Sequence, residues 1–344
     1  MKEPTLEGLI ASSSGYRNAA ILQTAVKLDL FTLVSSGANE LDAIAAATHA
    51  DKRALARLLE ACCGIGWLRK EDGKYVNPPA VDSHLVRGKP DYIGFAILHG
   101  YDLYSRWGTL YEVVMSGKAT PHPEASDETE VAQVTGNSVA YRASRAEIFA
   151  GAMDVSGRAV APILAKNLDL SSAITLLDVG GGPGRYTEAF LLANPHLCAT
   201  ILDLPDTIEV AKKRLAETGV FDRLAFISGS YYEVVIPTKY DAVFLSSIIH
   251  SFGDDDVLRL FRRLAPHVAD GGRLLVRDFF VNEDRTGPEW PAVFSINMLV
   301  QTDGGRSYTV EETKSVLRGA GFTKFEYGSY GMPEGHGLLS AFRG

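Results

Sequence analysis

The sequence predicts an α/β protein in which a doubly wound parallel sheet follows a mostly helical N-terminal region. From Ile174 onward, short apolar runs alternate with amphipathic segments, which is the pattern of buried parallel strands joined by helices. Before residue 115, apolar residues recur at intervals of three and four, the period of a helix. The chain has 344 residues, enough for two domains that each bury a core.

The composition argues against several classes of protein. The formal net charge of −8 is unfavourable for a partner with a phosphate backbone, so we expect no nucleic-acid partner. The cysteines, Cys62, Cys63 and Cys198, form no Cys-x-x-Cys pair and are expected to be reduced, as in the cytoplasm. No signal peptide is visible, and no apolar run approaches the roughly 20 residues of a membrane span. We therefore expect a cytoplasmic protein without a membrane partner.

The first 115 residues predict a winged-helix domain, in which two helices precede a hairpin. Asp51 can accept an unpaired backbone N–H group and so begin the second helix, over residues 52–63. Asp72-Gly73 is a typical hairpin turn between the short strands that follow. The helix that would contact DNA carries few basic residues for a DNA-binding surface on an acidic protein. We therefore expect this domain to serve packing or dimerisation.

The next segment predicts a connection between two domains. Residues 117–137 are rich in Pro, Thr, Ser and acidic residues, which is typical of a surface loop. A helix is expected from about residue 141 to residue 167. The expected organisation is a winged-helix domain over 1–115, connecting helices over 116–170 and a sheet domain over 171–344.

The strands and helices of the sheet domain can be placed from their patterns. Five apolar runs are expected to be strands, at residues 174–177, 199–202, 224–227, 242–245 and 272–276. Four amphipathic segments are expected to be helices, at residues 187–194, 207–218, 254–268 and 310–320. A ligand should bind beyond the carboxyl ends of such strands, near the point where the strand order reverses.

A glycine-rich loop follows the first of these strands, in the sequence Asp178-Val-Gly-Gly-Gly-Pro-Gly184. Glycines let the backbone turn sharply and let a ligand approach closely. Pro183 interrupts the usual phosphate-binding spacing, and Asp178 suits the cationic methionine end of S-adenosylmethionine better than a pyrophosphate. Asp203 ends the second strand about 20 residues further on, where an acid can bind both ribose hydroxyls. The alternatives are that the glycine loop is a tight turn without a ligand and that Asp178 and Asp203 are structural acids. The combination of all three features favours S-adenosylmethionine.

These motifs resemble those of the class I methyltransferases related to plant caffeate O-methyltransferase, acetylserotonin O-methyltransferase and bacterial natural-product O-methyltransferases. The resemblance covers essentially the whole chain. It rests on the glycine loop, Asp203-Leu-Pro205, Asp241-Ala-Val-Phe244 before a histidine, and Gly319-Ala-Gly-Phe322. It implies a Rossmann-like methyltransferase domain, S-adenosylmethionine as cofactor and an N-terminal winged-helix dimerisation domain. It also implies a homodimer in which one subunit's N-terminal segment helps to close the other's substrate pocket.

His250 is the candidate catalytic base, because it follows the fourth strand and matches the histidine of these enzymes. Imidazole, with an ordinary pKa of about 6.5, is suited to accept a proton at neutral pH. Asp278, at the end of the fifth strand, matches the acid that orients that histidine and would stabilise the imidazolium. The structural alternatives are a helix-entry role for His250 and an ion pair between Asp278 and neighbouring Arg277.

The resemblance also implies further site residues. Those expected to contact the cofactor are Asp178, Gly180, Gly182, Asp203, Leu204, Gly229, Ser230, Tyr231 and Ser246. Those expected in the acceptor pocket are Phe149 and Met153, which match a Phe-x-x-x-Met signature, with Trp107, Phe294, Asn297 and Met298.

Some positions depart from the plant enzymes. Ser230 replaces an aspartate after the third strand, Ser246 replaces a lysine and Phe252 replaces a tryptophan. Ser307 stands where those enzymes carry a second catalytic glutamate. The base is therefore expected to have one orienting carboxylate, which keeps carbon and nitrogen acceptors open beside a hydroxyl.

The sequence thus predicts methyl transfer from S-adenosylmethionine to a hydroxyl of a small aromatic or polyketide-like acceptor. The alternatives are a C- or N-methyltransferase of the same fold and a winged-helix regulator that senses S-adenosylmethionine without catalysis. We expect no metal site. Asp254-Asp-Asp256 suits the first turn of a helix, whose dipole favours acids, and His99, His267 and His336 lack ligand spacing.

Overall fold

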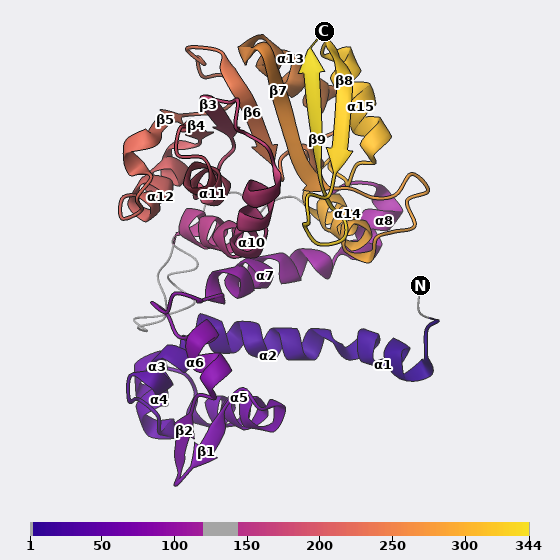
Figure 1. The fold of residues 1–344 in the computed structure, drawn as a ribbon. Helices are drawn as coiled ribbons and strands as arrows, with labels where there is room; N and C mark the ends of the chain where they lie inside the picture. The colour runs from indigo at the N-terminus through magenta and orange to yellow at the C-terminus, as the bar shows by residue number, and fades with distance from the viewer. Residues whose placement is uncertain (1–2, 120–143, 344) are drawn as a thin grey trace. The chain divides into compact units, whose positions relative to one another are not determined.

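The computed structural model describes residues 3–119 and 144–343, which fall into two units (Figure 1). Within the described residues, the two units comprise 3–105 with 144–155, and 106–119 with 156–343. Most of the loop predicted at 117–137, and the helix start predicted at residue 141, lie outside the described residues.

The first unit begins with a run of helices and a β-hairpin. Its elements are α1 (Leu6–Ser14), α2 (Tyr16–Lys27), α3 (Leu30–Ser35), α4 (Leu41–Thr48), α5 (Lys52–Ile65), β1 (Arg69–Glu71), β2 (Lys74–Val76) and α6 (Pro79–Leu85). The strands pair antiparallel, and Asp72 and Gly73 turn the chain at positive φ of 47° and 83°. The Asp51 carboxylate accepts the Ala54 N–H at 2.8 Å and caps α5. The predicted hairpin and N-cap are therefore confirmed.

The core of the first unit leaves its first helix uncovered. Leu30, Phe31 and Leu59 are buried in one apolar cluster with the hairpin residue Tyr75. By contrast, α1 buries none of its residues. Two further helices, α7 (Gly94–Trp107) and α10 (Arg145–Asn167), contain residues of both units.

The second unit is built on a seven-stranded sheet in the order β5-β4-β3-β6-β7-β9-β8. Its strands are β3 (Thr175–Val179), β4 (Cys198–Asp203), β5 (Leu224–Ser228), β6 (Tyr240–Ser246), β7 (Val268–Phe279), β8 (Phe322–Gly328) and β9 (His336–Arg343). The first five are parallel, and β9 lies antiparallel between β7 and β8. The predicted doubly wound parallel sheet is confirmed, with an antiparallel edge. Strand order reverses between β3 and β6, where a ligand is expected at the carboxyl ends.

Helices cover both faces of this sheet. They are α11 (Arg185–Ala193), α12 (Pro205–Leu215), α13 (Asp254–Leu264) and α15 (Val310–Gly319), with the second half of α10. Two further helices, α8 (Leu110–Ser116) and α14 (Glu289–Gln301), contact each other, and α14 also contacts the short turn that carries His250. Because strand side chains alternate between faces, neighbours on β7 enter different clusters. Val276 packs with Phe261 of α13, whereas Leu275 packs with Phe190 of α11. The helix predicted to begin at Asp254 is confirmed as α13.

By length and composition α10 could cross a membrane, contrary to the expectation that no apolar run reaches such a length. Val160, Ala161 and Leu164 of this helix are buried in the same cluster as β-strand residues of the second unit. A core helix of a globular domain can have the same length and composition. The properties of α10 are therefore only weak evidence for a membrane-spanning segment.

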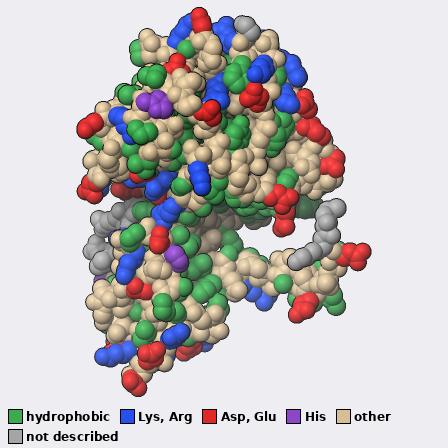
Figure 2. Space-filling view, viewed as in Figure 1, with side chains coloured by type: hydrophobic (Ala, Val, Ile, Leu, Met, Phe, Trp, Pro, Cys, Tyr) green, Lys and Arg blue, Asp and Glu red, His purple; other side chains and the backbone are tan. Residues whose placement is uncertain are grey.

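Acidic and basic side chains are interspersed on the face of the molecule in Figure 2. Exposed pairs such as Lys239 with Asp270, at 2.9 Å, are typical of this surface. Solvent screens such exposed pairs, so each one adds little to the stability of the fold.

Candidate active site

The glycine loop between β3 and α11 is closed on its inner side and open at Gly182. Gly180, Gly182 and Gly184 have φ of 66°, 57° and 76°, the left-handed region that favours glycine. A Cβ on Gly180 would lie 2.5 Å from Ile248, and one on Gly184 would lie 2.7 Å from Leu215. A Cβ on Gly182 would meet no atom within 4 Å. The loop thus packs tightly on the sheet and leaves room for a ligand at its centre.

Asp178 lies beneath this loop. Its carboxyl group is 1% exposed and accepts a hydrogen bond from the Thr187 hydroxyl at 2.5 Å. Burial raises the pKa of Asp178 to about 7, against the opposing effect of the Thr187 bond. A cationic group bound nearby would stabilise the carboxylate form. Its predicted contact with the methionine end of the cofactor stays a prediction.

Asp203 is held at the end of β4 by backbone donors. Its Oδ2 accepts the Gly182 N–H at 2.8 Å, and its Oδ1 accepts the Leu204 N–H at 2.7 Å. Burial raises the pKa of Asp203, whereas these two bonds favour the carboxylate. Each carboxylate oxygen has a further lone pair, so the group can still accept bonds from ribose hydroxyls. Leu204, the next residue, is 56% exposed beside it.

The loop after β5 and the end of β6 carry the other predicted cofactor residues. Gly229 donates its N–H to the Asp203 carbonyl at 2.9 Å. The Ser230 hydroxyl accepts the Tyr232 N–H at 3.2 Å, so it stabilises its own turn. The Tyr231 ring lies 5.0 Å from that of Tyr232. Ser246 ends β6 and bonds the Tyr186 side chain.

His250 and Asp278 meet at the carboxyl edge of the sheet. His250 Nδ1 lies 2.7 Å from Asp278 Oδ1, and the two residues are 7% and 1% exposed. Asp278 Oδ1 also accepts the Phe279 N–H at 2.8 Å, which fixes the carboxylate. Because a carboxylate accepts, Nδ1 is the donor and Nε2 is the acceptor nitrogen. The arrangement leaves Nε2 able to take a proton.

Aromatic rings line the His250 imidazole. Phe279 stacks on it with ring centroids 6.0 Å apart, and Phe294 approaches edge-on at 4.7 Å. Trp290 extends this wall, with its ring 5.9 Å from that of Phe294. Phe279 and Trp290 were not among the predicted pocket residues. The available signal was the i, i+4 spacing of Trp290 and Phe294 on one helix.

The remaining predicted pocket residues lie on three helices. Asn297 of α14 accepts the Trp107 indole N–H at 3.0 Å, and Met298 beside it is buried. Phe149 and Met153 lie on the part of α10 that belongs to the first unit, where the Phe149 ring is 5.6 Å from that of His99. Their place in the acceptor pocket stays a prediction.

The second carboxylate of the plant enzymes has no equivalent at Ser307. Ser307 is fully buried, and its hydroxyl donates to the Pro291 carbonyl at 2.7 Å. Asp278 Oδ2 is buried and has no hydrogen-bond partner among the residues that the structure describes. The ion pair with Arg277 considered from the sequence is absent within that part of the chain. Among the described residues, Asp278 is the carboxylate that contacts His250.

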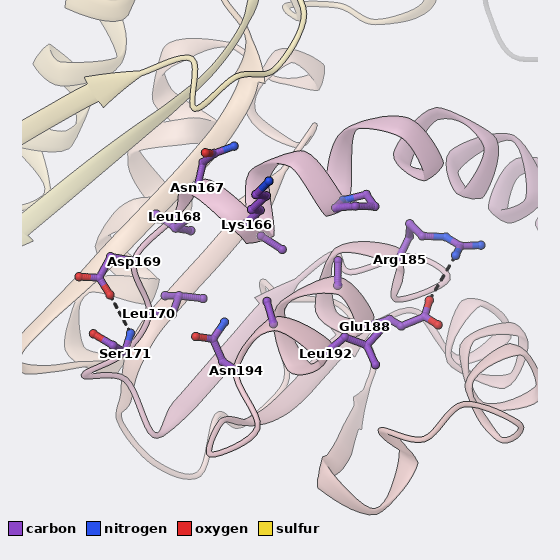
Figure 3. Close-up of a pocket in the computed structure, with 14 residues that line it drawn as sticks. Lys166, Asn167, Leu168, Asp169, Leu170, Ser171, Arg185, Glu188, Leu192 and Asn194 are labelled. Carbon is purple, nitrogen blue, oxygen red and sulfur yellow. Dashed lines mark hydrogen bonds and ion pairs between the residues drawn. The ribbon is translucent and has the colours of Figure 1, made fainter.

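One large cavity lies away from these residues. It has a volume of about 780 Å³ and is bounded by the end of α10, the 168–171 loop and α11 (Figure 3). Figure 3 shows the Arg185–Glu188 ion pair and Leu192 along its wall. The 168–171 loop leads into β3, so this cavity sits toward the amino ends of the strands. Chemistry, not volume, therefore identifies the site.

A second cavity adjoins the segment that follows His250. It has a volume of about 760 Å³ and is lined by Ser251, Phe252, Gly253, the three aspartates that begin α13, Asp303, Gly304 and Arg306. Arg306 pairs with Asp254 at 2.7 Å. This cavity is therefore an acidic surface around one neutralising arginine.

Comparison with known proteins decides the family. A family model for the O-methyltransferase domain matches residues 107–323, and one for the O-methyltransferase dimerisation domain matches residues 10–87. This chain belongs to the O-methyltransferase family. The resemblance inferred from the motifs is thereby confirmed.

Relatives of this O-methyltransferase match nearly the whole chain. The 3-hydroxy-5-methyl-1-naphthoate 3-O-methyltransferase of Streptomyces sahachiroi is 28% identical over 340 residues, 99% of this chain and 95% of the relative. The tetracenomycin polyketide synthesis 8-O-methyl transferase TcmO of Streptomyces glaucescens is 30% identical over 318 residues, 92% and 91% of the two chains. A structure of PigF with SAH, from a Serratia protein, has a TM-score of 0.82 at 25% identity, covering 99% of this chain and 100% of that chain.

These findings establish the class of the enzyme. It is an S-adenosylmethionine-dependent O-methyltransferase with an N-terminal dimerisation domain. The O-methyltransferase prediction is confirmed, and the alternatives of a C- or N-methyltransferase and of a non-catalytic regulator find no support.

The residues around the glycine loop fit this cofactor. Gly182 leaves open space where a ligand can approach the backbone, and Asp203 is held beside it with lone pairs to spare. The cofactor, when bound, supplies a methyl group already activated for transfer. The protein must then hold the acceptor hydroxyl and remove its proton.

Proposed function

We propose that the enzyme methylates a hydroxyl group of a small aromatic or polyketide-like acceptor, with His250 as general base and Asp278 as its orienting acid. The observation that carries this proposal is the 2.7 Å bond from His250 Nδ1 to Asp278, which leaves Nε2 as proton acceptor. General-base catalysis of this kind contributes typically about 10²- to 10⁴-fold to a rate.

The dyad performs two tasks in this proposal. Asp278 holds the imidazole in the tautomer with the proton on Nδ1, so that Nε2 faces the hydroxyl as an acceptor. As the oxygen bonds to the transferred methyl group, its proton passes to Nε2, and Asp278 stabilises the imidazolium that results. The buried position of both groups limits competition from water.

The acceptor class follows from the aromatic wall. Phe279 and Phe294 lie 4.8 Å apart beside His250, and flat rings pack favourably on such surfaces. The relatives from Streptomyces have names that specify a hydroxynaphthoate and a tetracenomycin polyketide. We infer an aromatic natural-product hydroxyl for this chain as well.

We further propose a cytoplasmic homodimer in which α1 packs against a second copy of the chain. Leu6, Leu9 and Ile10 of α1 are 76%, 59% and 59% exposed, a surface that a partner would cover. The matched dimerisation domain begins at residue 10, within this helix. The free thiols suit a reducing compartment, and burial raises the pKa of Cys62 to about 11. With a net charge of −8, we expect no nucleic-acid or membrane partner.

Incubation of the enzyme with S-adenosylmethionine and a panel of hydroxyaromatic compounds tests the proposed reaction. Each compound should be paired with its amino analogue and with an analogue that has only carbon nucleophiles. Mass spectrometry and NMR of the products should locate the new methyl group on oxygen. Methylation confined to the nitrogen or carbon analogues would refute the proposed acceptor.

A further inference from the structure

A buried cation lies next to the catalytic dyad. Arg277 of β7 is 3% exposed, and its guanidinium donates to the Ser247 hydroxyl at 2.6 Å and to His336 Nδ1. Its Nε is buried and has no hydrogen-bond partner among the described residues. One donor of a fully buried arginine is therefore unused.

No carboxylate among the described residues forms an ion pair with this cation. Within residues 3–119 and 144–343 no carboxylate lies within ion-pair distance of Arg277. Burial and the charge of Arg277 lower the pKa of His336 to about 4, so that this partner is neutral at neutral pH. The other neighbours are ring faces, with the guanidinium carbon 4.7 Å from the Phe279 centroid and 5.6 Å from that of Tyr186. A buried charge without a counter-charge is unfavourable, and a bound anion would relieve it.

The neighbours of Arg277 place the cation where the ligands of this enzyme meet. Ser247 precedes His250 by three residues, and Tyr186 lies in the first turn of α11, directly after the glycine loop. Phe279 contacts both Arg277 and the His250 ring. These side chains retain part of their exposure, so the cation lies just beneath the surface at the carboxyl edge of the sheet.

The acid next in sequence does not fill this role. Successive residues of a strand point to opposite faces, so Asp278 is directed away from the Arg277 side chain. Its Oδ1 is occupied by His250 and the Phe279 N–H. The charge of Asp278 weakens the positive potential at Arg277, but Asp278 accepts no hydrogen bond from Arg277 Nε.

We propose that Arg277, held by Ser247 and His336, binds a carboxylate group of a ligand in the active site. This inference rests on the proposed function, because it assigns a residue of the same site. The guanidinium has five N–H donors in a planar fork that matches a carboxylate, and bonds between two charged partners are roughly twice as strong as neutral ones. Nε, which has no partner among the residues that the structure describes, is the donor available without loss of an existing bond.

Two ligands of this enzyme can bring a carboxylate to that point. One is the methionine carboxylate of S-adenosylmethionine, since Tyr186 and Ser247 border the cofactor loop and the end of β6. The other is an aromatic acid as acceptor, since Phe279 joins Arg277 to the wall beside His250. A hydroxynaphthoate, which the name of one relative specifies, is an acceptor of this chemical class.

Paired ligands that differ only in the carboxylate test the proposal. Calorimetry should compare S-adenosylhomocysteine with its decarboxylated analogue, and a hydroxynaphthoate with the corresponding naphthol on enzyme loaded with S-adenosylhomocysteine. The variants are Arg277→Gln and Arg277→Lys. Arg223→Gln is the matched control, because the partners of Arg223 within the described part of the chain are backbone carbonyls of residues 191–197, at the other end of the sheet.

We expect Arg277→Gln to weaken binding of one carboxylate ligand by about tenfold or more and to leave its decarboxylated partner within about twofold. Arg277→Lys should fall between Gln and wild type, which keeps the test valid if the Gln variant does not fold. The pair that responds identifies the source of the carboxylate. Equal losses for both members of both pairs, or no loss at all, would overturn the inference. A carboxylate effect in an enzyme that methylates no hydroxyl would support the inference and refute the proposed function.

Discussion

His250 and Asp278 are 28 residues apart in sequence, yet their Nδ1 and Oδ1 atoms lie 2.7 Å apart. The contact forms because β6 and β7 are adjacent and parallel, with Ser246 opposite Arg277. The short turn after β6 then brings the imidazole back over the end of β7. Two segments at one edge of the sheet thus form the proposed catalytic dyad.

Replacement of the base should stop catalysis without preventing cofactor binding. We expect His250→Ala to lower kcat by about 10²- to 10⁴-fold, because the variant lacks the proposed proton acceptor. Binding of S-adenosylhomocysteine, measured by calorimetry, should change by less than about threefold. His267→Ala is the control, because His267 is a half-buried residue that contacts the Thr238 carbonyl, away from the dyad. Full activity of the His250 variant would exclude it as base.

Loss of the orienting acid should affect kcat more than KM. Asp278→Asn can donate to Nδ1, which favours the tautomer that has its proton on the wrong nitrogen. We expect kcat to fall by at least about 10²-fold. Asp270→Asn is the matched control, since Asp270 lies near the opposite end of β7 and its side chain is 96% exposed. Similar kinetics for the two variants would argue that Asp278 has only a structural role.

The crowding of Gly180 can be separated from its backbone conformation. Gly180→Ala places a methyl group 2.5 Å from Ile248 at a φ of 66°. Gly271→Ala has the same kind of strain, at a φ of 77°, but its Cβ would meet no atom within 4 Å. We expect the free energy of unfolding of Gly180→Ala to be about 1–3 kcal/mol lower than that of Gly271→Ala, because only the first substitution overpacks its surroundings. Urea denaturation measures this difference, and equal values would mean that the loop accommodates the methyl group.

The buried Asp178 should make the stability of the ligand-free enzyme fall with rising pH. Burial raises the pKa of its carboxyl group from 3.8 to about 7, so the folded state keeps a proton that the unfolded state has lost. Between about pH 4 and pH 7 the unfolded chain therefore binds fewer protons, and the free energy of unfolding decreases. Asp178→Asn should flatten this decrease in urea denaturation at a series of pH values. An unchanged slope would show that the carboxyl group is already ionised in the folded state.

His336 should have the opposite effect on how the free energy of unfolding changes with pH. Its pKa is lowered from 6.5 to about 4, so the unfolded state binds the extra proton between these values. This residue makes the free energy of unfolding rise with pH over that interval. His336→Asn should remove that rise, so the two variants should change the pH slope in opposite directions.

The exposed face of α1 predicts a change of oligomeric state. A variant with Leu6, Leu9 and Ile10 all replaced by serine should shift the enzyme from dimer toward monomer in light scattering, because the proposed partner surface is lost. Val235→Ser is the control, since Val235 is 84% exposed on the second unit and lies outside the matched dimerisation domain. A variant that stays fully dimeric would place the interface elsewhere.

Local patterns were enough to predict the glycine loop and the parallel strands. Gly180 and Gly184 follow a buried strand and precede a helix within a few residues, so sequence spacing alone locates them. The pairing of His250 with Asp278 was predicted through the family resemblance, because strand adjacency cannot be read from either segment. Such contacts depend on which strands lie side by side in the folded sheet.

Other features depend on contacts that no local pattern reveals. The sequence suggested Arg277 as a partner of its neighbour Asp278, but strand alternation separates the two side chains. Arg277 instead meets His336, 59 residues away, because β9 runs antiparallel beside β7. Trp290 and Phe279 were missed because their role comes from the packing of α14 beside His250.

The hydroxyl of Ser307 joins the Pro291 carbonyl in the first turn of α14, while the dyad is carried by β7 and the short turn after β6. In the proposed function, α14 supplies Trp290 and Phe294 to the aromatic wall, whereas β7 supplies Phe279 together with Asp278. Part of the wall therefore lies on a helix that carries neither member of the dyad. An evolving lineage, or an engineer, could exchange Trp290 to change the acceptor while the strand that carries Asp278 stays the same.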